Sequence, residues 1–488
     1  MQYHQSQNWA LWGKNMFSDY ELEAIHNTSL EILSSTGIYV EEEDARAYFA
    51  GAGAKVDHDK HIVKIPKWLV QEAITVSPAS FILAGRDPKF DYPMGTGRVG
   101  YANVGIAVSV NDPETGKIRP SYKKDLDDYA HLIDQLDNLV MCWDCIQPMD
   151  VHADTSGIHA FRSHVSNTRK HIMTTTPDRI TSQAVVKMAA EVVGGMEALA
   201  ERPLISAGSC PKSPLTFSTA VTAPIIELAK ASQPVMAMSM VLAGATGPVT
   251  MAGSLALHNA EILAALTLTE IIKKGCPFWY GSCTSIMDLR RAIAATGCAE
   301  HAMFGAATAR MAQFYHLPCV APGTWTDSKI TDVQAGYEKA ISSLLPALAG
   351  ADIIFGSGTL AGGMAVDFGS MVTENDMFKT IQFILRGIPV NEDTLALGLI
   401  QRIGPKGEYL SAEHTLKNMR NSQVWPDLFD RDSRSVWEAA GAKPLDVKGR
   451  EKAVELINNA NPAPLPENVQ KRLADIIDDV EKEIGIKK

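Results

Sequence analysis

"PVMAMSMVL" (residues 234–242), "SLALHNAEILAALTLTEIIKK" (254–274) and "PFWYGSC" (277–283) follow one another in the middle of the chain. The first and third are short, almost continuously apolar runs, whereas the second is long enough for a buried helix. Continuous apolar strands are typical of a parallel sheet that is covered on both faces. This stretch therefore predicts a strand–helix–strand unit of an α/β fold.

The same alternation recurs from about residue 100 to residue 388. Eight strand–helix units close most simply into a TIM (β/α)8 barrel, because right-handed crossovers join neighbouring parallel strands. An open doubly wound sheet is the alternative, and it is disfavoured because no glycine-rich phosphate fingerprint follows an early strand. The expected strands are residues 101–110, 139–145, 171–176, 203–209, 234–242, 277–283, 318–324 and 352–358.

Segments of different character flank the predicted barrel, which spans residues 96–390. Residues 1–95 are expected to form an N-terminal α/β cap, with Ser18 and Glu21 in the spacing of a capping box at the start of its first helix. Residues 391–488 are polar and helical, and they predict a C-terminal helical extension that wraps the barrel or a neighbouring subunit. We therefore expect a homo-oligomer.

Composition excludes several classes of partner. The chain has 488 residues, 46% hydrophobic, and a formal net charge of −11, which argues against nucleic acid and against an anionic membrane surface. Seven cysteines, an odd number, favour reduced thiols over a disulfide framework. The first 15 residues lack the pattern of a signal peptide, and no uninterrupted apolar stretch approaches the length of about 18 residues that suggests a membrane span. We expect a soluble cytoplasmic protein.

Aromatic residues gather at the carboxyl ends of the predicted strands, where barrel enzymes place their active sites. They are Trp143, Tyr280, Trp325 and Phe355. Paired carboxylates with a histidine partner do not stand out there, so general acid–base chemistry has no evident agent. Aromatic faces bind a quaternary ammonium, although core packing is the alternative for any single ring. We expect binding and desolvation by the protein, with no catalytic side chain.

The loops after the last two predicted strands contain further residues that could bind a substrate or order the site. In "GSGTLAGG" (356–363), the amides of Gly356, Ser357 and Gly358 are expected either to hold a substrate carboxylate or to form a tight turn. Asp327 and Lys329 are expected to order the loop after Trp325, with a structural ion pair between them as one alternative.

Three further motifs leave the chemistry open. Thr331 and Gln334 have the spacing of a capping box, and "LRR" (289–291) supplies either a carboxylate-binding arginine or a helix-surface pair. "CWDC" (142–145) is most simply structural, because strand positions i and i+3 point to opposite faces. A metal site at His152, His159 and His164 is the alternative, although we expect no metal.

Two long stretches resemble a known family. "GTWTDSKITDVQAGYEKA" (323–340) and "IIFGSGTLAGGMAVDFGSMVTENDMF" (353–378), with the eight-unit layout, are similar to the trimethylamine methyltransferase family, and in particular to its members without pyrrolysine, which include glycine betaine:corrinoid methyltransferases. The resemblance implies a TIM barrel that passes a methyl group from an amine to Co(I) of a corrinoid (cobalamin) on a separate small protein. Asp327 and Lys329 would then order the loop or face the corrinoid.

The resemblance also bears on the substrate. Its trimethylamine members carry pyrrolysine, which is absent from this sequence, so a quaternary amine is expected: first glycine betaine, then carnitine, proline betaine or γ-butyrobetaine. "DVHADT" (150–155) has Thr155 where a corrinoid-binding Asp-x-His-x-x-Gly pattern needs glycine, so the corrinoid is expected on the partner. A zinc-dependent barrel methyltransferase and a non-catalytic betaine-binding module are the alternatives.

Overall fold

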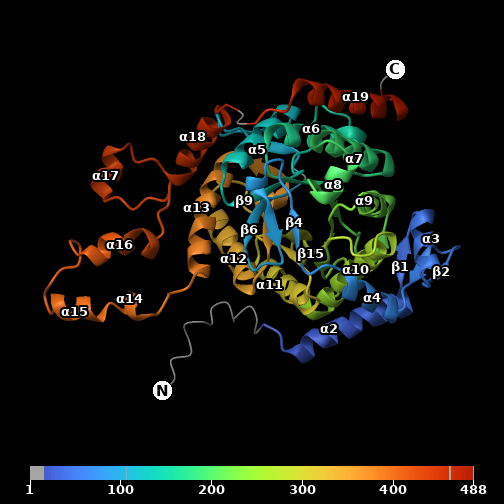
Figure 1. Cartoon of the computed structure of the whole chain (residues 1–488), viewed down its shortest axis with the longest axis horizontal. Helices are drawn as coiled ribbons and strands as arrows, with labels where there is room; N and C mark the ends of the chain where they lie inside the picture. The colour runs from blue at the N-terminus through green and yellow to red at the C-terminus, as the bar shows by residue number, and fades with distance from the viewer. Residues whose placement is uncertain (1–15, 106, 461–462, 487–488) are drawn as a thin grey trace.

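A closed barrel of eight parallel strands forms the centre of the computed structural model, which describes residues 16–105, 107–460 and 463–486 (Figure 1). Each barrel strand pairs in parallel with the next barrel strand along the chain. The eighth strand pairs in parallel with the first, with Ile354 opposite Tyr101, and this closes the barrel. The predicted TIM barrel is confirmed. Its strands are β6 (Gly100–Asn103), β9 (Leu139–Trp143), β10 (His171–Thr174), β11 (Ile205–Ser209), β13 (Val235–Ser239), β15 (Phe278–Ser282), β18 (Cys319–Pro322) and β19 (Ile353–Ser357).

Each barrel strand is followed by a helix that covers the outside of the barrel (Figure 1). The long helix after β13 has 22 residues and is apolar enough to span a membrane by composition, but 89% of its apolar window is buried inside the protein. Its apolar character is thus that of a core helix. The covering helices are α5 (Lys123–Gln135), α6 (Ser156–Asn167), α7 (Arg179–Val193) with α8 (Met196–Glu201), α9 (Thr219–Lys230), α10 (Met251–Ile272), α11 (Ala299–Phe314), α12 (Val333–Ala349) and α13 (Phe368–Leu385).

The N-terminal cap contains α2 (Asp19–Glu31), α3 (Glu43–Gly51) and α4 (Lys67–Val76), and α2 begins at the predicted Ser18–Glu21 capping box. Residues 1–15, which bear on the signal-peptide prediction, lie outside the described part of the chain. The cap sheet is completed by a barrel segment, because β12 pairs in parallel with β1. Its strands are β1 (Ile38–Val40), β2 (Lys55–Asp57), β3 (Ile62–Lys64) and β12 (Thr216–Phe217).

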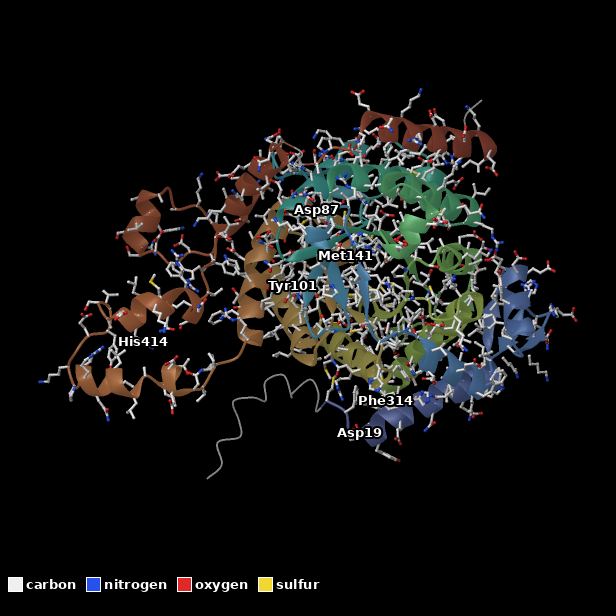
Figure 2. All side chains as sticks on the ribbon, in the orientation of Figure 1. Asp19, Asp87, Tyr101, Met141, Phe314 and His414 are labelled. Atoms are coloured by element: carbon white, nitrogen blue, oxygen red, sulfur yellow. The ribbon has the colours of Figure 1, made fainter. Side chains whose placement is uncertain are left out.

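A hairpin of β4 (Phe81–Leu83) and β5 (Tyr92–Met94) closes the amino end of the barrel. Tyr92 donates its hydroxyl proton to the carbonyl of Asp352, the residue before β19. Leu83 and Met94 join the buried cluster that fills the barrel, together with inward-pointing Met141, which is labelled in Figure 2. The barrel is therefore sealed at this end.

Short additional strands lie in the loops at the carboxyl end of the barrel. The first barrel strand was predicted to extend to residue 110, but β6 ends at Asn103 and the following residues enter a separate hairpin. The prediction was wrong because a continuous apolar run does not reveal where a strand leaves the sheet. These added strands are β7 (Ser109–Asn111), β8 (Ile118–Pro120), β14 (Leu242–Ala243), β16 (Ser285–Asp288), β17 (Ile293–Ala295), β20 (Thr359–Leu360) and β21 (Ala365–Asp367).

The C-terminal extension has two parts. Helix α18 packs against α13 and α5, and helix α19 packs against α7 and α6. The four helices between α13 and α18 project away from the barrel (Figure 1). The helices of the extension are α14 (Glu392–Leu395), α15 (Leu397–Ile403), α16 (Glu413–Ser422), α17 (Arg434–Ala439), α18 (Leu445–Ile457) and α19 (Glu467–Glu483).

Candidate active site

Three of the four predicted rings meet at the carboxyl end of the barrel. The ring centroid of Phe355 lies 5.4 Å from that of Trp143 and 6.2 Å from that of Trp325. All three side chains are at most 6% exposed and belong to the cluster that fills the barrel. Strand alternation explains two of them, because Trp143 and Phe355 end the inward-facing rows of β9 and β19.

Tyr280 does not join these rings. It lies on the outer face of β15, where its hydroxyl donates a 2.9 Å hydrogen bond to Asn259 Oδ1 on α10. Its neighbour Trp279 points inward instead, with its ring 6.4 Å from Phe81 of the hairpin that closes the amino end. Because side chains alternate along a strand, the choice between these two neighbours decides which ring enters the barrel.

Trp325 is held by two glycines, one near the end of β19 and one in the segment that follows β20. A Cβ atom on Gly356, whose φ is +131°, would lie 2.5 Å from Cδ1 of Trp325 and 2.1 Å from the carbonyl oxygen of Gly323. A Cβ atom on Gly363 would lie 2.5 Å from Cζ3 of the same indole. The indole can occupy this position only because neither residue has a side chain. Gly363 was not singled out from the sequence, although the run of glycines was a signal.

The turn formed by Gly356, Ser357 and Gly358 is organised by a carboxylate of the protein. Glu374 Oε2 accepts hydrogen bonds from Ser357 Oγ (2.7 Å) and from the Gly358 amide (2.8 Å). Glu374 forms an ion pair with Lys339, and both side chains are 4% exposed. The Gly358 amide is therefore engaged within the protein rather than directed at a substrate carboxylate.

Asp327 orders a neighbouring loop. Its carboxylate accepts hydrogen bonds from the amide of Thr296 (3.0 Å) and of Gly297 (3.2 Å), so it ties the loop after β18 to the loop after β17. Lys329 Nζ donates to the backbone carbonyl of Asp327 (2.6 Å) and is otherwise exposed. The alternative of an ion pair between the Asp327 and Lys329 side chains is wrong.

The start of α12 also differs from the prediction. Its N-cap is Asp332, whose side chain accepts a hydrogen bond from the amide of Ala335, so the capping box predicted at Thr331 and Gln334 is wrong by one residue. Both Thr and Asp are good N-caps, and the sequence offers them side by side.

Two residues that sequence reasoning missed contact the tryptophans. Asn103 at the end of β6 accepts a hydrogen bond from the amide of Trp143 (2.9 Å) and donates one to its carbonyl (2.7 Å). His301 on α11 lies edge-on to Trp325, with 6.1 Å between ring centroids. No motif distinguished either residue, since both stand in apolar surroundings.

The state of His301 follows from its contacts. Nδ1 lies 3.1 Å from the carbonyl oxygen of Thr284, which can only accept, so Nδ1 carries the proton and Nε2 presents a lone pair. Burial lowers the pKa of His301 to about 4. A neutral imidazole therefore lies beside Trp325, and among the described residues neither His301 Nε2 nor the indole Nε1 of Trp325 has a hydrogen-bond partner.

The three histidines of the alternative metal site do not converge. His152 lies 3.6 Å from Asp154, His159 lies 2.9 Å from Glu481, and His164 lies 3.0 Å from Asp144. Within the part of the chain that the structure describes, no group of three His, Cys, Asp or Glu side chains is arranged for a metal ion.

The "CWDC" and "LRR" motifs lie where their side chains contribute to structure. Cys142 and Cys145 are buried as free thiols. Arg290 and Arg291 lie in the exposed turn between β16 and β17 and contact Asp288, so the prediction that they form a helix-surface pair is wrong.

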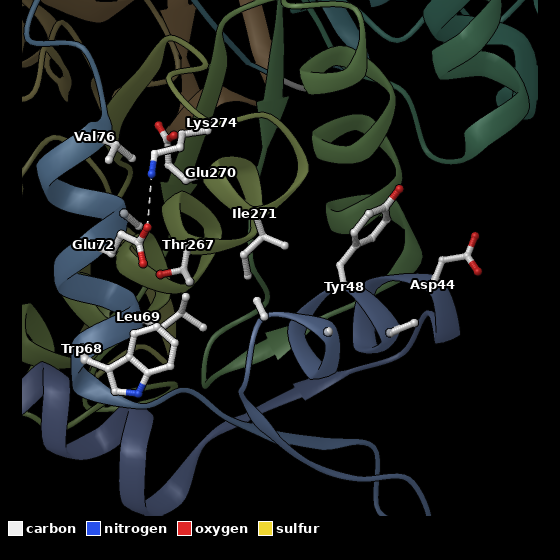
Figure 3. Close-up of a pocket in the computed structure, with 14 residues that line it drawn as sticks. Asp44, Tyr48, Trp68, Leu69, Glu72, Val76, Thr267, Glu270, Ile271 and Lys274 are labelled. Atoms are coloured by element: carbon white, nitrogen blue, oxygen red, sulfur yellow. Dashed lines mark hydrogen bonds and ion pairs between the residues drawn. The ribbon is translucent and has the colours of Figure 1, made fainter.

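An open cavity lies elsewhere on the molecule (Figure 3). It has a volume of about 820 Å³ and is bounded by α3, α4 and the carboxyl end of α10, where Lys274 pairs with Glu72 at 3.2 Å. Burial raises the pKa of Glu270, on its wall, to about 7. Because helices of the barrel run back from the carboxyl ends of the strands, this cavity lies at the opposite end from the three rings and is not the expected place for catalysis.

The chain is similar to known proteins over most of its length. The profile of the trimethylamine methyltransferase (MTTB) family matches residues 7–485. Trimethylamine methyltransferase MttB of Desulfitobacterium hafniense is 39% identical over 470 residues, which cover 96% of this chain and 95% of that protein. Trimethylamine methyltransferase MttB1 of Methanosarcina mazei is 35% identical over 473 residues, again 96% and 95% of the two chains.

A more distant relative and a solved structure are also similar to this chain. A glycine betaine methyltransferase of Desulfitobacterium hafniense is 27% identical over 475 residues, covering 96% of this chain and 98% of that protein. The crystal structure of the Methanosarcina barkeri monomethylamine methyltransferase (MtmB) aligns with a TM-score of 0.50 and 12% identity, covering 96% of this chain and 94% of that one, which shows a shared fold.

The placement of Trp325 can be tested through Gly356→Ala. The new Cβ would collide with the Gly323 carbonyl and the indole, and overpacking of this kind costs about 1–3 kcal/mol. We expect a lower unfolding midpoint in denaturant together with a changed near-ultraviolet circular dichroism spectrum. Gly51→Ala is the control, because nothing lies within 4 Å of its Cβ. An unchanged spectrum and midpoint for Gly356→Ala would contradict this packing.

Proposed function

This chain belongs to the trimethylamine methyltransferase family, and from that premise we propose that it moves a methyl group from a quaternary amine to Co(I) of a corrinoid held by a separate protein. Glycine betaine, which would give dimethylglycine, is the first choice. Carnitine, proline betaine and γ-butyrobetaine are the related alternatives.

The observation that carries this proposal is the convergence of Trp143, Trp325 and Phe355 inside the barrel mouth. A trimethylammonium group cannot donate a hydrogen bond from nitrogen, so it is bound by aromatic faces and by loss of water. Each well-placed ring contributes about 0.5–2 kcal/mol. The rings would thus supply a site whose chemistry matches a permanent cation.

The groups near the rings are poor proton donors at neutral pH. His301 is neutral, and burial raises the pKa of the Cys283 thiol, which belongs to the same cluster as the rings. Loss of a methyl group from a quaternary nitrogen leaves a neutral tertiary amine, which needs no proton. The tasks left to this chain are to bind, orient and desolvate the cation.

Trp325 offers a further contact to a betaine. Its indole N–H is buried and has no partner among the described residues. A buried donor without an acceptor costs about 1–3 kcal/mol, and a substrate carboxylate would remove that cost. This contact replaces the Gly358 amide as the proposed partner of the carboxylate, because Gly358 is bound to Glu374.

The corrinoid would supply the nucleophile that accepts the methyl group, and it fits a partner docked at the barrel mouth. His152 of the "DVHADT" stretch is half exposed and pairs with Asp154, and Thr155 is fully buried, which does not suit cobalt ligation by this chain. Loops beyond the carboxyl ends of the strands instead expose large apolar side chains that a carrier would cover. These are Val108, Met149, Met240, Leu289, Ile293 and Met364.

A reducing compartment suits this reaction. All seven cysteines are free thiols, and Co(I) is a strong reductant. We therefore place the protein in the cytoplasm.

Trimethylamine is the second candidate substrate, because relatives with 39% and 35% identity bear that name. A panel of the four quaternary amines and trimethylamine, each with chemically reduced cobalamin, separates the two. We expect nuclear magnetic resonance to detect dimethylglycine from glycine betaine only when cobalamin is present. Demethylation without any corrinoid, or demethylation of trimethylamine alone, would refute the proposal. Stoichiometric zinc in the purified protein would favour the zinc-dependent alternative.

Trp325→Ala should lower kcat/KM for the quaternary amine about 10- to 30-fold, as expected if one ring contributes up to about 2 kcal/mol. Tyr280→Phe is the matched control. It removes the hydroxyl bonded to Asn259 and should cost stability, about 1–3 kcal/mol, without changing kcat/KM. Equal losses of activity in both variants would place the cation elsewhere.

The rate of methyl transfer should be independent of pH between about 6 and 9. His301 titrates with a pKa of about 4, well below this range, and the Cys283 thiol stays protonated. A plot of kcat/KM against pH with saturating reduced cobalamin tests this. A bell-shaped profile in that range would reveal an acid or base that takes part in the reaction.

A further inference from the structure

The open cavity between α3, α4 and the carboxyl end of α10 takes no part in the chemistry proposed above (Figure 3). Its volume of about 820 Å³ lies within the range of about 300–1,000 Å³ that is usual for ligand pockets. The charged side chains on its wall are three carboxylates and one amine, namely Asp44, Glu72, Glu270 and Lys274. An excess of negative charge in a hollow favours a cation.

Two of the three carboxylates already have partners. Glu72 pairs with Lys274 at 3.2 Å, and Asp44 pairs with Arg179 of α7 at 2.7 Å. A divalent metal ion is therefore a poor fit, because it binds several oxygen ligands and Glu270 would have to provide them alone. An organic cation with a hydrogen-bond donor needs only one carboxylate.

Glu270 has an acceptor atom that the protein does not use. The residue is 7% exposed, and its Oε2 accepts a hydrogen bond from the Gly275 amide (2.6 Å). Its Oε1 is without a hydrogen-bond partner within the described part of the chain. The hydroxyl of Ser77, at the end of α4, faces the same carboxylate but makes no hydrogen bond either. A buried acceptor without a donor costs about 1–3 kcal/mol, and an N–H group bound in the cavity would remove that cost.

The position of Glu270 along its helix also favours a cation. Helix α10 ends at Ile272, so Glu270 lies in its last turn. The carboxyl end of a helix carries partial negative charge, which repels a carboxylate and attracts a positive group. Without a ligand, the carboxylate at this place destabilises the end of α10.

An exposed aromatic ring borders the same cavity. Trp68 on α4 is 57% exposed, and a Cβ atom on Gly53 would lie 3.2 Å from its Cζ2, so the cap supports one edge of the indole. Tyr48 of α3 lines the cavity as well, across from α4 in Figure 3. Aromatic faces attract cations and pack against apolar groups.

We propose that this cavity binds a protonated amine with an apolar body, in a site separate from the rings at the barrel mouth. The ammonium N–H donates to Glu270 Oε1, and the apolar body packs on Trp68 and Tyr48. A quaternary ammonium fits this cavity less well, because it has no N–H for Glu270. The cavity and the barrel mouth would therefore select different alkylammonium ions.

The experiment titrates the full-length protein with 2-phenylethylamine, followed by ligand-observed nuclear magnetic resonance at pH 8. Glu270→Gln keeps an acceptor for the Gly275 amide but removes the charge, and it should weaken binding at least tenfold. Trp68→Ala should weaken binding at least threefold, and it tests the site independently if the Glu270 substitution disturbs folding. Glu197→Gln, the same change at an exposed residue of α8, is the matched control and should bind like the unmodified protein.

The pH dependence gives a second measurement. Burial raises the pKa of Glu270 to about 7, so its ionised form should increase about tenfold between pH 6 and pH 8, and the affinity should rise with it. The probe, like lysine, stays protonated over this range. The other charged groups on the wall are Asp44, Glu72 and Lys274, and Glu270→Gln should abolish the rise if Glu270 causes it.

Two comparisons separate this cavity from the ring site. The N,N,N-trimethyl derivative of the probe, which has no N–H, should bind the cavity at least tenfold more weakly. Trp325→Ala should leave binding of 2-phenylethylamine unchanged. Absence of saturable binding, equal affinity for both probes, or a loss caused by Trp325→Ala rather than by Glu270→Gln would overturn the proposal.

Discussion

The buried ion pair between Lys339 and Glu374 fixes the carboxyl end of the eighth strand. Removal of two charges from water offsets most of their attraction, so such a pair adds little net stability, although loss of one partner is costly. Its effect is on position. Glu374 also accepts hydrogen bonds from Ser357 and Gly358, so α12, α13 and the turn after β19 share one arrangement. Gly356, in the strand just before that turn, then lies against Trp325.

The ring site is thus positioned largely by backbone. Trp325 lies where two glycines leave room, and Trp143 is held by the amide group of Asn103 bonded to its own N–H and carbonyl. Trp143 needs no charged neighbour for its place, whereas Trp325 depends on one indirectly, because the Lys339–Glu374 pair orders the end of the strand that contains Gly356. This arrangement suits the cation site proposed above, because Lys339 and Glu374 are not members of the buried cluster that contains the rings.

The fold could be predicted from sequence because eight apolar runs alternate with helical segments, a pattern that only a few topologies satisfy. The same apolar continuity hides the direction of side chains. In "PFWYGSC" both faces of the strand are buried, so nothing in the letters tells that Trp279 faces inward and Tyr280 outward. His301 and Asn103 were missed because their roles depend on contacts between segments distant in sequence. The hairpin at Arg290 and Arg291 was missed for a related reason, since short added strands have little pattern.

In the proposed site, the two candidate substrates differ in which unpartnered nitrogen, Nε1 of Trp325 or Nε2 of His301, they would engage. A tertiary amine gives up a methyl group readily only as its protonated cation, whose N–H then needs an acceptor, and the lone pair on Nε2 of His301 could provide one. A betaine carries no N–H, but its carboxylate needs a donor, and the indole N–H of Trp325 could provide that. Aromatic faces attract both cations. His301 Nε2 needs a hydrogen-bond donor, which a quaternary amine does not have. Trp325 Nε1–H needs an acceptor, which trimethylammonium does not have. If the proposed site is correct, its selectivity would rest on the atoms at the edges of the rings rather than on the rings themselves.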